Sequence, residues 1–112
     1  MENLIVTTTN QELADSVFHA ELEGVELSLL LRKHWDPASA ERIFYIGVGL
    51  ASSVATNVFA SWLWERIKEF RAQKVDIEGR ACPHNEAEIA ELVQRVIVDS
   101  KQGAANNSEH EP

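Results

Sequence analysis

The chain has 112 residues, enough for one compact domain, and its 45% hydrophobic and 25% charged residues are typical of a globular protein. Its 10 Lys+Arg and 18 Asp+Glu give a formal net charge of -8, which argues against direct binding to nucleic acid and makes membrane contact unlikely as a function. The single cysteine, Cys82, excludes an internal disulfide, and no secretory signal pattern is visible. We therefore expect a small acidic cytoplasmic protein.

The charges are unevenly distributed along the sequence. Residues 1–31 carry six acids and no Lys or Arg, residues 32–74 carry seven bases and four acids, and residues 75–112 carry eight acids and three bases. The simplest interpretation is a solvated surface that keeps a small protein soluble. The alternative is that the acidic ends imitate the phosphates of a nucleic acid and occupy a basic groove on a target protein.

The first elements are predicted from short apolar patterns. Leu4–Thr9 is β-branched and predicts a strand, and Asn10 is a suitable N-cap for a helix over Gln11–Leu22. A hairpin in which Val17–Leu22 pairs with Val25–Leu31 competes with that helix, because glycine in the connecting turn favours hairpins. In both interpretations residues 25–31 are expected to form a strand, because apolar and polar residues alternate at first and a short apolar run follows.

The centre of the chain has the most ambiguous pattern. Asp36 and Pro37 predict the start of a new helix, and the next 22 uncharged residues, Ile43–Trp64, match the length of a membrane span. Against a span, Ser53, Asn57 and Ser61 form a polar stripe, as on an amphipathic helix at a protein surface. We therefore expect a long central helix.

The length of this helix sets a further expectation. Unbroken from Ser39 to Gln73, it would be about 50 Å long at 1.5 Å per residue, which is longer than a compact domain of this size. A kink or break near Gly47–Gly49 would resolve the conflict, although Ile43–Ile46 is itself strand-like.

The C-terminal third has clearer signals. Residues 74–78 alternate and Gly79 follows, which predicts a short strand and a turn. Asn85 is a predicted N-cap for a helix from Glu86 to about Ser100. The sequence after Lys101 has no apolar periodicity, so we expect one compact domain over residues 1–101 and a mobile acidic tail over residues 102–112.

Residues capable of catalysis do not form a recognisable motif. Cys82, Pro83 and His84 bring a thiol and an imidazole together in sequence, but no acid partner is suggested and the proline separates them. The remaining candidates, His34-Trp35-Asp36 and the serine pair Ser52-Ser53, are better explained as a helix cap, a core aromatic residue and surface hydroxyls. No metal-binding or cofactor-binding spacing occurs, so we expect a non-enzymatic protein without catalytic, cofactor-binding or metal-binding residues.

Partner binding is the remaining class of function. Gly47, Ala51 and Ala55 recur every four residues, which on a helix would give a ridge of small side chains for close packing, within the fold or with another protein. Large aromatic residues and neighbouring acids add candidates for the same role. The predicted partner-binding residues are Ala51, Ala55, Trp62, Trp64, Glu88 and Glu91.

A resemblance to a known bacterial family covers roughly half of the chain and rests on three segments. They are Ser53–Lys68, with its small residues and Trp-Leu ending, then Val75–Gly79, then Asn85–Val98. This pattern is similar to that of the effector-associated constant components, small modules encoded beside effectors in bacterial conflict systems. The resemblance implies a non-enzymatic accessory role and provides no catalytic residues. Asp76 and Glu78 depart from the family's basic character around this strand, which weakens any nucleic-acid role by analogy.

The sequence as a whole predicts an α+β fold, with a small mixed three-stranded sheet from residues 4–9, 25–31 and 74–78. The central helix and a C-terminal helix are expected to cover this sheet. The expected function is protein binding, as an accessory, adaptor or inhibitor module of a prokaryotic or phage conflict system. The partner would be another protein or a second copy of the chain. The alternatives are a small membrane protein that spans once through residues 43–64 and an acidic inhibitor that imitates nucleic acid.

Overall fold

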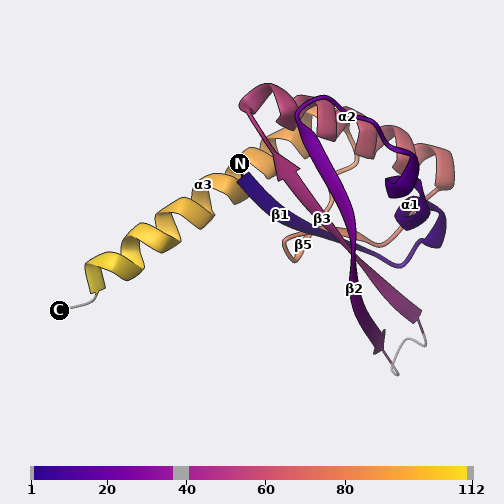
Figure 1. Ribbon diagram of the computed structural model, residues 1–112, viewed down its shortest axis with the longest axis horizontal. Helices are drawn as coiled ribbons and strands as arrows, with labels where there is room; N and C mark the ends of the chain where they lie inside the picture. Colours follow the sequence, from indigo (N-terminus) through magenta and orange to yellow (C-terminus); the bar gives the residue numbers. More distant parts are fainter. Residues whose placement is uncertain (1, 37–40, 111–112) are drawn as a thin grey trace.

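The computed structural model describes the backbone of residues 2–36 and 41–110 and the side chains of residues 2–30 and 42–100 (Figure 1). In chain order the elements are β1 (Glu2–Thr8), α1 (Gln11–Ser16), the 3₁₀ helix η1 (Val17–His19), β2 (Val25–Asp36), β3 (Glu41–Leu50), α2 (Ser53–Phe70), β4 (Val75–Ile77), β5 (Arg80–Ala81) and α3 (Glu86–His110).

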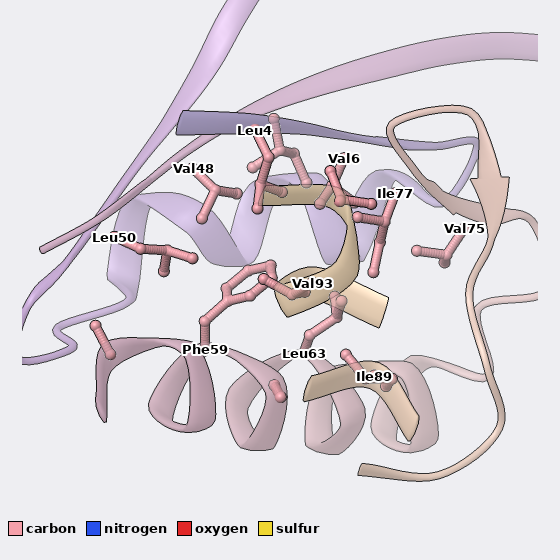
Figure 2. Close-up of a cluster of buried hydrophobic side chains, with 14 of the residues drawn as sticks. Leu4, Val6, Val48, Leu50, Phe59, Leu63, Val75, Ile77, Ile89 and Val93 are labelled. Atoms are coloured by element: carbon pink, nitrogen blue, oxygen red, sulfur yellow. The ribbon is translucent and has the colours of Figure 1, made fainter. Parts of the chain in front are cut away.

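The strands form a five-stranded sheet in the order β2-β3-β1-β4-β5, and every neighbouring pair is antiparallel. The helices α2 and α3 pack on one face of this sheet, and the core lies between the two layers (Figure 2). The predicted α+β class is confirmed. The sheet differs from the predicted mixed, three-stranded one because β3 and β5 add two strands and no parallel pair occurs.

The largest correction concerns the centre of the chain. Residues 41–50 form strand β3, between β1 and β2, so Gly47 and Gly49 lie in a strand rather than at a helix kink. Helix α2 begins only at Ser53, where the Ala55 N–H donates a 3.3 Å hydrogen bond to the Ser52 hydroxyl oxygen. Pairing on both edges favours a strand for residues with β-branched and aromatic side chains, and this tertiary pairing overrides the apparent helical continuity.

The segment that suggested a membrane span is therefore not one helix, because residues 43–64 are divided between β3 and α2. Within the part of the chain that the structure describes, no helix is both long enough and apolar enough to cross a membrane. Asp36, predicted to cap a helix, is instead the last residue of β2 and pairs with Glu41, while Pro37 lies outside the described residues.

The helix after β1 is shorter than predicted. The predicted cap is confirmed, since the Leu13 N–H donates a 2.8 Å hydrogen bond to Oδ1 of Asn10. The α-helix ends at Ser16 and continues as the 3₁₀ turn η1. Of the alternative hairpin only an isolated bridge between Leu22 and Val25 is present.

The C-terminal elements agree more closely with the sequence. The turn between β4 and β5 consists of Glu78 and Gly79, whose φ angles of 50° and 79° suit a tight two-residue hairpin. The Glu88 N–H donates a 2.8 Å hydrogen bond to Asn85 Oδ1, which confirms the predicted start of α3. The helical backbone continues to His110, beyond the expected end near Ser100. The division into a domain over 1–101 and a mobile tail over 102–112 stays a prediction.

The core depends on the alternation of the strands. In β1, Leu4, Val6 and Thr8 are buried, and Leu4 and Val6 point between the layers towards Phe59 and other apolar side chains of the helices (Figure 2). The further core contributors from sheet and helices are Ile46, Val48, Leu50, Leu63, Val75, Ile77, Ile89 and Val93. The apolar stripes of both long helices are thereby buried against one face of one sheet.

This packing gives a stability prediction. Phe59 is fully buried, so Phe59→Ala is expected to lower the free energy of unfolding by about 3–5 kcal/mol. Val54 lies in the first turn of the same helix but is 69% exposed, so Val54→Ala is the matched control and should change stability by less than about 0.5 kcal/mol. Urea denaturation followed by circular dichroism measures both. Equal stability of the two variants would contradict the assigned core.

Candidate functional site

The sheet has a second face, which faces away from α2 and α3. Residues opposite each other on antiparallel strands share a face, and Leu4 and Val6 point into the core, so the alternate positions of β1 point away from it. The residues Asn3, Gly49 and Glu26 form one row across three strands, and Ile5, Gly47 and Ser28 form the next.

Gly47 lies at the centre of this face. At Gly47, a Cβ atom would lie 2.8 Å from Ser28 Oγ and 3.3 Å from Leu30 Cδ2, so the neighbouring side chains occupy the space that a larger residue would need. The same face has a hollow of about 690 Å³, which we call the sheet-face hollow. Its lining residues are Asn3, Leu4, Ile5, Glu26, Leu27, Ser28, Leu30, Gly47, Val48, Gly49 and Glu78.

The Glu78 carboxylate is fixed at one side of this hollow. Its Oε1 accepts a 2.9 Å hydrogen bond from the Ile5 N–H, and the Glu78 N–H donates a 2.9 Å bond to the Ile5 carbonyl. Glu26, from β2, is exposed on the other side. These are the hollow's two ionisable lining residues, so its potential is negative at neutral pH.

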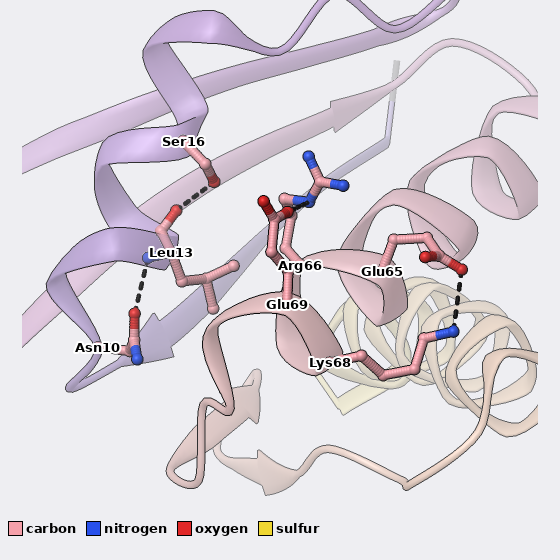
Figure 3. A network of polar contacts seen from close by, with 7 residues as sticks. All are labelled: Asn10, Leu13, Ser16, Glu65, Arg66, Lys68 and Glu69. Atoms are coloured by element: carbon pink, nitrogen blue, oxygen red, sulfur yellow. Dashed lines mark hydrogen bonds and ion pairs between the residues drawn. The ribbon is translucent and has the colours of Figure 1, made fainter.

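A second concave surface, which we call the α1–α2 groove, has a volume of about 400 Å³. Its lining residues are Glu12, Asp15, Ser16, His19, Ala20, Trp62, Arg66 and Phe70. Asn10 joins its two walls, because Oδ1 caps α1 while Nδ2 donates a 3.4 Å hydrogen bond to the Phe70 carbonyl at the end of α2. Figure 3 shows that Arg66 and Glu69 lie on the side of α2 that faces α1, with Arg66 Nε 3.1 Å from Glu69 Oε2.

The residues predicted to bind a partner are not brought together in one site. Trp62 lines the α1–α2 groove, where its ring stacks on Phe59 at a centroid distance of 6.2 Å. Trp64 instead packs beneath Lys68, whose Nζ lies 5.5 Å from the ring centroid. Glu88 and Glu91 are exposed on α3, and Glu91 Oε1 lies 3.1 Å from Arg95 Nη2.

The predicted ridge of small residues does not exist as a helix face. Gly47 is in β3, and Ala51 precedes α2, where its N–H donates a 2.9 Å hydrogen bond to the Gly24 carbonyl. Ala55 is only 2% exposed and packs beside Gly24, at which a Cβ atom would lie 3.2 Å from the Ala55 Cβ. The position of Ala55 is thus explained by packing inside the fold.

Sequence reasoning missed the residues of the sheet-face hollow because it placed Gly47 and Gly49 in a helix. One signal could have identified them. From Ile46 to Leu50 the larger side chains alternate with glycines, and a period of two indicates a strand with one bulky and one bare face.

The residues that were considered for catalysis have structural roles. Burial, and secondarily the charge of Asp76, raises the pKa of the Cys82 thiol to about 12, which disfavours the nucleophilic thiolate. Ser52 caps α2, and His84 is exposed. Among the described side chains, no group of three or more His, Cys, Asp or Glu is placed to hold a metal ion. The side chains of His34, Trp35 and Asp36 lie outside the described set.

Comparison of the chain with protein-family models, with curated proteins and with solved structures gives no significant match.

The close approach between Gly47 and Ser28 on the concave face can be tested by substitution. Gly47→Ala is expected to lower stability by about 1–3 kcal/mol, because the new methyl group overlaps Ser28 Oγ. Ser28→Ala removes that oxygen, so the double variant should regain part of the lost stability. Thermal unfolding of the parent, the single variants and the double variant measures this coupling. Additive effects would contradict the close approach.

The second test concerns the raised pKa of Cys82. The thiol should react slowly with iodoacetamide at pH 8, and its rate should increase only as the pH approaches about 12. Because the folded chain holds this proton more tightly, the associated stability is present below pH 9 and is lost between pH 9 and about 12. The chain unfolded in urea is the control. An alkylation midpoint near pH 9 in the folded chain would contradict the assigned environment.

Proposed function

We propose that this chain is a non-enzymatic protein-binding module that acts in the cytoplasm as an accessory, adaptor or inhibitor. The observation that supports this proposal is the sheet-face hollow, a concave surface floored by glycine on the side of the sheet away from α2 and α3. The pattern-level resemblance to effector-associated constant components suggests a prokaryotic or phage conflict system as its setting.

The chemistry of the hollow favours binding over catalysis. It combines the half-buried main chain of Gly47 with apolar side chains such as Ile5 and Leu30 and a few polar groups, a mixture that suits contact with another protein. Its ionisable lining residues are two acids, and one oxygen of Glu78 already accepts a hydrogen bond from Ile5. A general acid–base mechanism would need groups free to exchange protons with a substrate.

The acidic groups on α3 give less support to imitation of a nucleic acid. Glu91 is paired with Arg95, and Asp99 Oδ2 lies 2.8 Å from Arg80 Nη2. A surface that imitates phosphates would present its carboxylates unpaired to a basic target. Partner binding through the sheet-face hollow is therefore the function proposed here.

Substitution in the hollow tests this function. Ser28→Arg places a long cationic side chain in the hollow, whereas Asn57→Arg makes the same charge change at an exposed position of α2. Tagged full-length parent and variants are used to capture proteins from the native host, which are identified by mass spectrometry. We expect the parent and Asn57→Arg to retain the same partner and Ser28→Arg to lose it, while all three melt at similar temperatures. Light scattering of the purified chains tests whether that partner is a second copy.

Two outcomes would contradict the proposal. Retention of the partner by Ser28→Arg would show that the hollow is not the contact surface. The absence of any specific partner, together with a monomeric mass, would contradict the binding function itself.

A further inference from the structure

The α1–α2 groove has aromatic and acidic walls. Trp62 and Phe70 come from α2, while Glu12 and Asp15 come from α1 on the opposite side. An aromatic face attracts cations through its quadrupole, and nearby carboxylates add to this attraction. The combination is therefore suited to a positively charged group rather than to a neutral or negative one.

The carboxylates of the groove are available for such a contact. Among the described side chains, neither Glu12 nor Asp15 forms an ion pair or a hydrogen bond. The one permanent cation in the lining, Arg66, lies 3.1 Å from Glu69, so its charge is offset by a carboxylate of its own helix. Glu12 and Asp15 thus leave the groove with a net negative charge.

The same helix shows how this chemistry holds a cation. On another side of α2, the Lys68 ammonium lies 5.5 Å from the centre of the Trp64 ring. It also lies 3.0 Å from Glu65 Oε1 (Figure 3). An indole and a carboxylate together hold this lysine. The groove offers Trp62 and two carboxylates in a comparable combination, with space of about 400 Å³ between its walls.

We propose that the α1–α2 groove binds a lysine or arginine side chain from a basic segment of a partner protein. The inference depends on the proposed protein-binding function and names the chemistry of the partner, but it uses a surface distinct from the sheet-face hollow. Charge complementarity supports this occupant, because residues 1–31 carry six acids and no Lys or Arg.

The walls of the groove are held in place before any ligand arrives. Stacking on Phe59 fixes the Trp62 ring, and the two hydrogen bonds of Asn10 hold the start of α1 against the end of α2. A preformed site loses less conformational entropy on binding than one that must be ordered.

The test is a titration of the ¹⁵N-labelled full chain at low salt with a capped five-residue Gly/Ser peptide that has arginine at its centre. Matched peptides carry lysine, norleucine or glutamate at that position, and spermidine serves as a small-molecule cation. We expect saturable shifts of the Trp62 indole N–H and of the amides of α1 with the arginine or lysine peptide only. Trp62→Phe assigns the indole signal and keeps an aromatic ring.

Two pairs of variants, each of which removes two negative charges, show where on the chain the peptide binds. Glu12→Gln with Asp15→Asn should weaken peptide binding about fivefold, because two exposed ion pairs are lost. Glu88→Gln with Glu91→Gln makes the same charge change on α3 and should leave the affinity unchanged. Raising the salt concentration should weaken binding of the parent.

Several results would overturn the inference. These are equal binding of the norleucine peptide, equal weakening by both pairs of variants, and binding of spermidine without binding of either basic peptide. Ser28→Arg should leave the groove unchanged, so failure of this inference is distinguishable from failure of the sheet-face hollow as a contact surface.

Discussion

The burial of one face of β1 is the constraint on which the rest of this structure depends. This strand lies in the middle of the sheet, and its alternate residues Leu4, Val6 and Thr8 are in the core. Because α2 and α3 pack against that same face, their apolar stripes are buried there. No helix of the described chain is left to cover the opposite face of the sheet. The concave face is thus a direct result of where the core forms.

The two proposed surfaces differ in how they are built. The sheet-face hollow is lined by Gly47 and Gly49 of β3, and Ser28 and Leu30 of β2 pack closely over Gly47. The α1–α2 groove exists because a short helix capped by Asn10 stands against the end of a long one. One surface is shaped by main chain and the other by large side chains, so they suit different parts of a protein partner.

Sequence reasoning identified the elements whose signals are local. The strands near residues 4–9, 25–31 and 74–78 and the start of α3 were all predicted, because alternation and the caps Asn10 and Asn85 depend on neighbours in sequence. The strand β3 was missed, since its apolar pattern runs without a charge into α2 and only pairing with β1 and β2 selects a strand.

The candidate sites follow the same division. Trp62 was predicted as a binding residue because a large aromatic residue stands out in any sequence, and it lines the α1–α2 groove, whereas Ile5 and Ser28 have meaning only once the register places them on either side of Gly47. The predicted helical ridge through Gly47 and Ala55 was wrong, because α2 does not extend back to Gly47. Residues that act through cross-strand position were therefore beyond the reach of the sequence pattern.

The hydrogen bonds of Glu78 affect how copies of this sheet could join. After the last β4 residue, the backbone turns away with φ 50°, and the Glu78 side chain, rather than its carbonyl, accepts the Ile5 N–H. A carboxylate therefore ends the ladder between β1 and β4, and beyond β4 the edge of the sheet is the two-residue strand β5, which is too short to favour the addition of a strand. At the opposite edge, the described chain places no strand outside β2. The two edges of the described sheet therefore differ in length, because β2 has 12 residues and β5 only two, so a strand added beside β5 would find little main chain to pair with.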